Sequence, residues 1–369
     1  MDSVNRRDFL GMGAAAAAAG PLSKNAPKPL STPAPKILNY NPDMEYRRLG
    51  KTGLMVSAVC MGGHWKRLDR VMSPGFKGVG YLDQDFENLK NPAFLANRSA
   101  VITHAMECGM NYIDACSPQE ILAYSKVLED RRDRMYFGFS WHTREPRYEE
   151  WRSSQKLIEG LEMSLKEARL EYVDLWRISL PMEAIADIDV VNRIEEATTK
   201  ALETARKQGK ARFTGVSSHN RVWLKYLIEH YPEQIQVVLF PYTAASKVLP
   251  EDSVFDALKQ NDTGAFGIKP FADNSLFAGD GGPKSTTFDE DNNRARLAIR
   301  YVLENPAMTA PIPGLATVQQ VDNVVAAIRE RKREGNLNRR QRSELERATA
   351  GLWSRLRPNH RFLHQWECV

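Results

Sequence analysis

The chain has 369 residues, of which 42% are hydrophobic and 26% charged, as in ordinary globular proteins. Its formal net charge is +5, but residues 1–36 contribute +3 of this. The remainder therefore gives no sign of a nucleic-acid surface. The four cysteines form no CxxC pair, which argues against a disulfide scaffold and a zinc finger.

The N-terminus has the pattern of an export signal. Residues 5–10 read NRRDFL, and a mild apolar run, mostly alanine, follows over residues 11–20. Such a pattern is typical of a twin-arginine signal, in which a receptor reads the arginine pair. The apolar run is too short for a stable membrane span. The competing interpretation is a chance arginine pair before an alanine helix.

Residues 23–35 are rich in Pro, Ser and Lys, and this composition favours a disordered linker. We therefore expect residues 1–36 to be signal and linker, the twin-arginine machinery to be a partner, and the protein to be exported, to the periplasm. Twin-arginine export carries folded proteins, often with a cofactor already loaded. That is a first hint of a bound nucleotide or metal.

From Met44 onward, runs of strand length alternate with segments of helical spacing. The expected strands are 56–61, 111–115, 135–139, 172–178, 212–216, 236–240, 266–271 and 310–313. Gly109, Gly209 and Gly264 are expected to end the helices before three of them. This alternation predicts a (β/α)8 TIM barrel over residues 37–330 and a C-terminal helical tail over 331–369. A doubly wound sheet is the alternative, but MGGH at 61–64 is not the GxGxxG turn expected there.

Several stretches carry a family resemblance. They are YRRLGKTGL at 46–54, CMGG at 60–63, GMNYIDA at 109–115, YVDL at 172–175, GKAR at 209–212, GVSS at 215–218 and PIPG at 311–314 before Asp322 and Asn323. In this order and spacing the chain resembles the aldo-keto reductases. The resemblance implies the barrel with an N-terminal β-hairpin.

The resemblance also implies a nicotinamide nucleotide across the carboxyl end of the barrel. The implied contacts are Gly62, Gly63, Ser217, Ser218, Gln236, Lys269, Pro270, Gly314, Thr317, Gln320 and Asn323. Ser217 and Ser218 could instead be ordinary caps, and Gln236 a core amide. A 2′-phosphate is normally met by Arg or Lys. TVQQV at 317–321 offers neither, so the cofactor is NADP or NAD.

The catalytic group departs from the family. Relatives use a tyrosine, a lysine, a histidine and an aspartate, and here Asp114 alone matches. A histidine could replace the tyrosine as proton donor, because its pKa suits neutral pH. We therefore name Asp114, His64 and His142 as catalytic candidates. Asp114, without its lysine, is expected to act as an acid or to pair with one of these histidines.

A metal is the alternative at the same strand ends. Two histidines with Cys116 or Glu120 could bind one. The chain has no HxH or HxxxH pair in this set, so no metal site is predicted. The long connection at 65–97 is expected to be a lid or substrate loop, with a simple surface excursion as the alternative.

These features predict an exported oxidoreductase that transfers hydride between a nicotinamide and a small-molecule carbonyl or sugar-like alcohol, with a non-standard proton donor. The alternative is a non-catalytic relative that keeps the nucleotide, or only the fold, for binding or a structural role.

The export signal gives the first testable prediction. Changing both Arg6→Lys and Arg7→Lys should retain the full-length precursor inside the cell, because the receptor reads the arginine pair. Immunoblots of cell fractions measure this, with Lys24→Arg in the linker as the control. An unchanged exported fraction of the double variant would remove the signal interpretation.

Overall fold

The computed structural model describes residues 36–65, 67–72, 76, 78, 86–180, 185, 187–244, 246 and 252–355. The predicted signal and linker up to residue 35, most of the expected lid between residues 65 and 86, and the tail beyond 355 lie outside the described residues. Within the described part, no helix is both long and apolar enough to cross a membrane.

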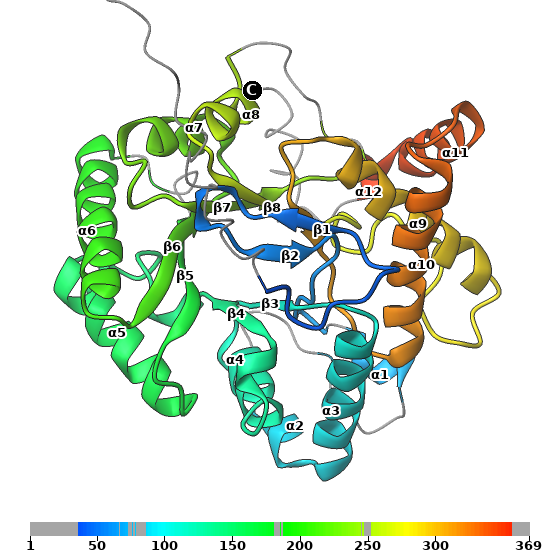
Figure 1. Ribbon diagram of the computed structural model, residues 1–369, viewed down its shortest axis with the longest axis horizontal. Helices are drawn as coiled ribbons and strands as arrows, with labels where there is room; N and C mark the ends of the chain where they lie inside the picture. Colours follow the sequence, from blue (N-terminus) through cyan, green and yellow to red (C-terminus); the bar gives the residue numbers. More distant parts are fainter. Residues whose placement is uncertain are drawn as a thin grey trace, which may run out of the picture. The chain divides into compact units, whose positions relative to one another are not determined.

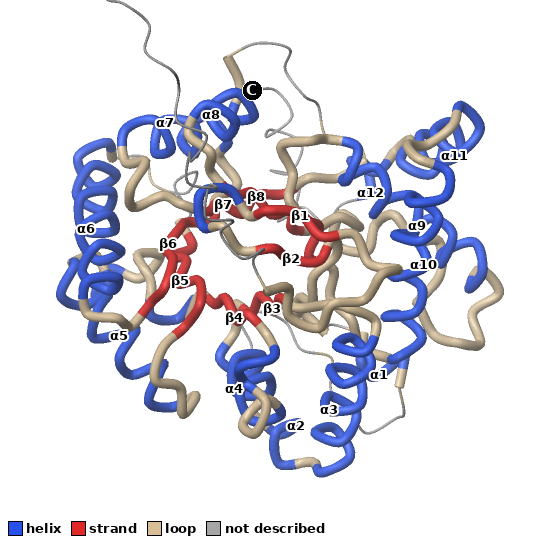
Figure 2. The backbone as a smooth tube through the Cα atoms, in the orientation of Figure 1, coloured by secondary structure: helices blue, strands red, loops and turns tan. Residues whose placement is uncertain are grey.

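Parallel strands form a ring at the centre of the fold (Figure 2). In hydrogen-bonded order they are β3 Tyr112–Ala115, β4 Tyr136–Phe139, β5 Val173–Ser179, β6 Ala211–Ser217, β7 Val237–Pro241, β8 Gly264–Ile268 and β9 Ala310–Ile312. Each pairs in parallel with the next along the chain. These strands confirm the predicted barrel.

The expected first strand, 56–61, is divided between two roles. Its start belongs to β2, Met55–Ser57, which pairs antiparallel with β1, Tyr46–Arg48, as the predicted hairpin. Its end closes the barrel through two isolated bridges, Met61 to Ile113 and Gly62 to Gly314. The backbone bends between these roles, so one predicted strand becomes a hairpin arm and a short closing segment.

The hairpin covers the amino end of the barrel. Beside it, the Lys51 amide donates to the Asp262 carbonyl, just before β8. The side chains of Leu49, Leu54 and Val56 lie in one apolar cluster with Tyr112 of β3 and Phe266 of β8. These side chains fill the centre of the barrel at this end, and a cavity opens at its carboxyl end.

Helices surround the ring (Figure 1). They are α1 Leu68–Val71, α2 Glu87–Lys90, α3 Pro92–Glu107, α4 Pro118–Val127, α5 Ser154–Glu167, α6 Ile188–Lys207, α7 Arg221–His230, α8 Val254–Gln260, α9 Phe288–Glu304, α10 Val318–Glu334, α11 Arg339–Thr349 and α12 Leu352–Arg355. The last two fall in the predicted C-terminal helical tail, and Leu345 and Ala348 of α11 pack with Leu297 of α9.

Two of the three glycine predictions are confirmed. Gly109 and Gly209 have φ of 90° and 70°, the left-handed conformation that follows a helix. Gly264 was expected in the same role but is the first residue of β8. There Asp262, with φ of 48°, takes the left-handed position instead. Gly264 is glycine because an added Cβ would lie 2.6 Å from a Leu49 methyl.

Arg98 of α3 ties the outer helices to the segment before α10. Its side chain is fully buried and stacks over the Trp65 ring at 4.7 Å. The guanidinium donates to the Leu315 carbonyl at 2.7 Å and also to the Ala316 carbonyl. A buried cation is tolerated here because several acceptors surround it.

We predict that Arg98→Met lowers the free energy of unfolding by about 2–4 kcal/mol, because two buried carbonyl groups lose their donor. Urea denaturation at pH 7 measures the difference. The control is Arg333→Met, whose side chain is 70% exposed and should change stability by less than about 0.5 kcal/mol. Equal stability of the two variants would contradict the role given to Arg98.

Candidate active site

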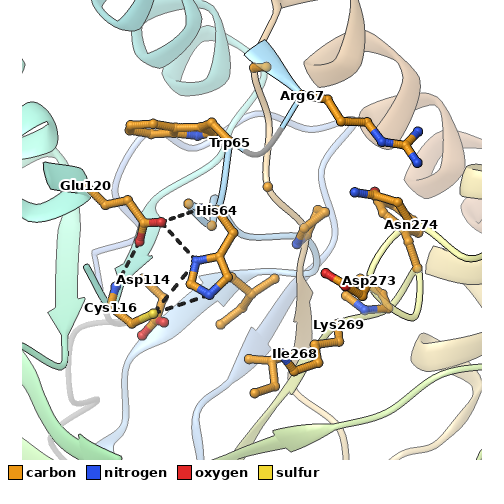
Figure 3. A pocket seen from close by; sticks show the side chains of 18 of the residues that line it. His64, Trp65, Arg67, Asp114, Cys116, Glu120, Ile268, Lys269, Asp273 and Asn274 are labelled. Atoms are coloured by element: carbon orange, nitrogen blue, oxygen red, sulfur yellow. Dashed lines mark hydrogen bonds and ion pairs between the residues drawn. The ribbon is translucent and has the colours of Figure 1, made fainter. Parts of the chain in front are cut away.

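A cavity of about 400 Å³ opens at the carboxyl end of the barrel. The closing segment at 62–65, the ends of β3, β5, β6 and β8, and the segment after β9 all contribute to its lining. His64, Asp114 and His142, the three catalytic candidates, all line it. Figure 3 shows His64, Cys116 and Glu120 on one wall, facing Lys269, Asp273 and Asn274.

Glu120 organises the first wall. Its side chain is fully buried in the third position of α4, where it forms a capping box with Ser117. One carboxylate oxygen accepts the Cys116 amide at 3.0 Å. The other accepts the His64 backbone amide and the His64 Nδ1–H, the latter at 2.9 Å. Glu120 thus joins the closing segment to the end of β3.

His64 and Cys116 touch each other beside this carboxylate. The Cys116 Sγ lies 3.5 Å from His64 Nε2 and 3.7 Å from His64 Nδ1. The His64 side chain is 31% exposed to the cavity. Its backbone has φ of 60°, uncommon for a residue with a side chain, and the Glu120 bonds hold it there.

Burial and charge shift the pKa values of this pair in opposite directions. Burial would lower the pKa of His64, but the nearby Cys116 and Glu120 outweigh it and raise that pKa to about 10. Burial would raise the pKa of Glu120, but its bonds to His64 and two backbone amides lower it to about 2. The carboxylate is therefore ionised beside the imidazole.

Asp114 has a different partner from the one expected. It was expected to act as an acid or to pair with His64 or His142, but its carboxylate binds Arg177 of β5 at 2.9 and 2.5 Å. Both side chains are 5% exposed. Burial raises the pKa of Asp114 and the guanidinium opposes that rise. Because arginine keeps its proton in proteins, its guanidinium favours the ionised carboxylate, and Asp114 is engaged with Arg177 rather than with His64 or His142.

Gly138 lies on β4, between the strands that carry Asp114 and Arg177. An added Cβ at Gly138 would lie 3.4 Å from Asp114 Oδ1 and 2.1 Å from the Tyr112 hydroxyl. Glycine is therefore required here because the Tyr112 hydroxyl occupies the space of its missing Cβ. Arg177 also lies 3.3 Å from the Ser217 hydroxyl, which links the pair to β6.

His142 lies deeper than a proton donor would. Its side chain is 1% exposed, and its Nδ1 donates to the Cys116 carbonyl at 2.8 Å. Burial lowers its pKa to about 4, so the imidazole is neutral at pH 7. The prediction that His142 lines the site is confirmed, but it acts on the Cys116 backbone rather than as an acid.

The residues expected to hold a nucleotide divide into two groups. Gly62, Gly63, Ser217, Lys269, Pro270, Gly314 and Gln320 line the cavity. The glycines are also required by packing, since a Cβ on Gly63 would lie 2.1 Å from the Glu120 carboxyl carbon. Thr317 lies at the N-cap of α10 and accepts the Gln320 amide. This helix end, at the edge of the cavity, suits a phosphate.

The position of Gln236 contradicts its predicted contact with the nicotinamide. It precedes β7 at the amino end of the barrel, and its side chain accepts the Thr214 amide at 3.2 Å. The nicotinamide contact expected there is wrong, because the cavity lies at the other end of the strand. Ser218 is buried and donates to the Leu180 carbonyl. Asn323 bonds to Arg296 of α9 at 2.7 Å.

Sequence reasoning missed several cavity residues and the pairing of Asp114 with Arg177. Arg67, from the predicted lid, lines the cavity and donates to the Gly279 carbonyl at 3.2 Å. Arg147 lines it as well. The SPQE string at 117–120 is a capping-box pattern that could have placed Glu120. No local pattern signals that Arg177 pairs with Asp114, because the contact crosses a neighbouring strand.

Residues 88–340 match the aldo/keto reductase family. Because this match covers more than half of the chain, the protein belongs to that family of oxidoreductases. It is 23% identical to L-galactose dehydrogenase from Arabidopsis thaliana over 313 residues, which cover 78% of this chain and 89% of that protein. It is also 23% identical to L-glyceraldehyde 3-phosphate reductase from Escherichia coli K12, with 69% of each chain covered.

Solved structures agree on the fold. The holo form of aldo-keto reductase AKR11C1 from Bacillus halodurans superposes with a TM-score of 0.56 at 18% identity, and covers 86% of this chain and 99% of that one. The thermostable aldo-keto reductase Tm1743, in complex with the inhibitor epalrestat, gives 0.57 at 19% identity, with 83% and 100% covered.

Glu145 generates a pH prediction. Its buried carboxyl accepts from the Ser140 hydroxyl and the Ser179 amide, and burial raises its pKa to about 7 against the effects of Ser140, Arg177 and Arg147. Between about pH 4.5 and 7 the native state then holds a proton that the unfolded chain has lost. Stability should therefore fall as pH rises through this window, by about 3 kcal/mol at most.

The measurement is the free energy of unfolding in urea at pH 5, 6, 7 and 8. Glu145→Gln should flatten this slope, because the amide does not titrate. Exposed Glu149 provides the control variant Glu149→Gln, which should keep the wild-type slope. The same slope in wild type and Glu145→Gln would show that Glu145 titrates normally.

Proposed function

We propose that this protein is an exported oxidoreductase that uses NAD or NADP to interconvert a carbonyl group and an alcohol on a small, sugar-like substrate. The observation that carries the proposal is the single cavity in which His64, Cys116, Glu120 and the Asp114–Arg177 pair meet the family's nucleotide-contacting positions. When bound, the nicotinamide supplies or accepts the hydride.

The cavity fits a nucleotide because it offers positively charged side chains and the N-terminus of a helix to the phosphates. Arg67, Arg147 and Lys269 bring positive charge to it, as a pyrophosphate requires. Gln320, at the N-terminus of α10, adds the end of a 17-residue helix. These groups come from four separate parts of the chain, and all of them line the same cavity.

We expect NAD and NADP to bind with similar affinity, because the site offers little to the 2′-phosphate of NADP. Residues 317–321 carry no cation, and the nearby Arg296 of α9 already has partners. Its guanidinium bonds to Asn323 at 2.7 Å and to Glu330 at 2.9 Å. A 2′-phosphate would therefore gain less here than at a dedicated arginine.

Among the described residues that line this cavity there is no tyrosine to match the family's proton donor. Tyr124 is fully buried and donates to the Gly62 carbonyl at 2.6 Å, and it does not line the cavity. Tyr81 lies outside the described residues. We assign the part of the tyrosine to the cluster of His64, Cys116 and Glu120, with His64 facing the substrate. We therefore expect little or no reduction of the simple aldehydes that ordinary relatives accept.

The substrate class is inferred from charge and from the relatives. The curated names of two of them refer to L-galactose and to L-glyceraldehyde 3-phosphate. The cavity wall opposite His64 carries Asp273 and Asn274. Such carboxylate and amide groups hydrogen-bond hydroxyl groups, so a polyhydroxylated substrate suits this wall.

We predict that NAD or NADP stabilises the protein against heat, because a ligand that binds only the native state adds about 2.7 kcal/mol at 100 times its Kd. Titration calorimetry should show a smaller preference for NADP than relatives show. Lys269→Met should weaken nucleotide binding about tenfold, as expected for one lost charge-assisted bond. The exposed Lys259 of α8 provides the control variant Lys259→Met.

Binding of neither nucleotide would overturn the proposal and favour a non-catalytic relative that keeps the fold alone. Nucleotide binding that Lys269→Met and Lys259→Met leave equally unchanged would place the nucleotide outside this cavity.

A further inference from the structure

We propose that His64, Cys116 and Glu120 form a binding site for a divalent cation of the zinc class, and that this cation polarises the substrate oxygen. The inference deepens the proposed function and rests on it. The sequence predicted no metal, because the three ligands come from residues far apart or irregularly spaced. The fold brings them together: their ligand atoms all lie within 4.8 Å of one another.

The distances suit a tetrahedral ion. With Zn–S near 2.3 Å and Zn–N or Zn–O near 2.0–2.1 Å, a tetrahedron separates sulfur from nitrogen by roughly 3.6 Å and nitrogen from oxygen by roughly 3.4 Å. Cys116 Sγ lies 3.7 Å from His64 Nδ1, and that nitrogen lies 2.9 Å from Glu120 Oε1. The sulfur lies nearly equally far from His64 Nε2, at 3.5 Å, so rotation of the Cys116 and His64 side chains would bring it to the side of Nδ1 where a cation binds.

The cation would take the place of one proton. In the structure the Nδ1 proton of His64 lies between the imidazole and Glu120 Oε1. A cation bound there would use both of these lone pairs together with the thiolate of Cys116. The backbone amides of Cys116 and Ser117 would continue to hold Glu120 Oε2. Such outer contacts are what orient a metal-binding carboxylate.

The ligand set selects the class of cation. One nitrogen, one sulfur and one carboxylate oxygen suit Zn²⁺, whereas Mg²⁺ and Ca²⁺ take oxygen ligands. Three protein ligands leave the fourth position open, as in catalytic zinc sites and unlike the closed four-ligand structural ones. Here the open position faces the cavity, because His64 and Cys116 are both partly exposed and line it.

The site explains how the chain could work without the family's tyrosine. A carbonyl oxygen gains negative charge as its carbon receives hydride, and a Lewis acid stabilises that charge without donating a proton. The balance is one carbonyl, one hydride from the reduced nicotinamide and one proton from solvent, giving one alcohol. The Asp114–Arg177 ion pair takes no part in this balance.

A second group of similar chemistry provides the matched control. His104 and Cys108 of α3 and Asp322 of α10 also bring their ligand atoms within 4.8 Å of one another. None of the three lines the cavity. Replacing Cys108 removes that sulfur without touching the proposed site, so a cobalt band that a Cys108→Ser protein shows and that Cys116→Ser removes reports on Cys116.

The test uses the full chain in the Cys108→Ser background, freed of metal by a chelator and titrated with Co²⁺. We expect one equivalent to bind with a thiolate-to-cobalt charge-transfer band and intense tetrahedral visible bands, both removed by Zn²⁺. Adding Cys116→Ser should abolish the charge-transfer band and weaken Zn²⁺ binding by about 100-fold or more, beyond the loss seen for outer residues. No charge-transfer band with Co²⁺, or a band that survives Cys116→Ser, overturns the proposal.

X-ray absorption of the Zn²⁺-loaded Cys108→Ser protein needs no change at the site, so it stands even if Cys116→Ser misfolds. One sulfur and lighter ligands in the zinc shell support the site, and a shell without sulfur overturns it. Nucleotide binding, measured separately, distinguishes the two proposals. Binding of NAD or NADP without zinc would overturn only the metal site. Binding of zinc without either nucleotide would overturn the proposed oxidoreductase function.

Discussion

The site depends on one buried carboxylate. Glu120 contributes nothing to the apolar core, and its burial would be costly if its oxygens lacked donors. The capping box of α4, the backbone amide of Cys116, and the backbone amide and Nδ1 of His64 supply those donors. A single side chain thereby fixes the start of a helix, the end of β3 and the closing segment of the barrel. Gly63 must be glycine because the carboxylate occupies the space of its missing Cβ.

The parts of the fold that sequence reasoning found are those with a local cause. Apolar runs of strand length gave the barrel strands, and Gly109 and Gly209 marked helix ends because only glycine takes that conformation cheaply. The prediction was wrong where the chain changes direction within an apolar run, at 56–61. It was wrong again at Gly264, where close packing against Leu49 requires a glycine for a different reason.

The site was partly predictable for a similar reason. In a barrel, polar residues that follow strands gather at one end, so Asp114, His64 and His142 were placed in the same cavity. Their partners were not predictable. Asp114 pairs with Arg177 across β4, and no spacing along the chain encodes a contact across a strand. Gln236 was placed at the wrong end of β7 by a resemblance that does not distinguish the two ends of a short strand.

The cavity holds two separate polar groups, the Asp114–Arg177 pair and the cluster of His64, Cys116 and Glu120, where relatives have one connected group. In relatives the aspartate neutralises a lysine, and that lysine acts on the tyrosine. Here Arg177 neutralises Asp114 and remains a permanent cation, so this pair cannot pass a proton. Charge that develops on a substrate oxygen must then be met from the other wall, where His64, Cys116 and Glu120 lie. Under the proposed function, this cluster therefore supplies the electrophile that the lysine and tyrosine supply in relatives.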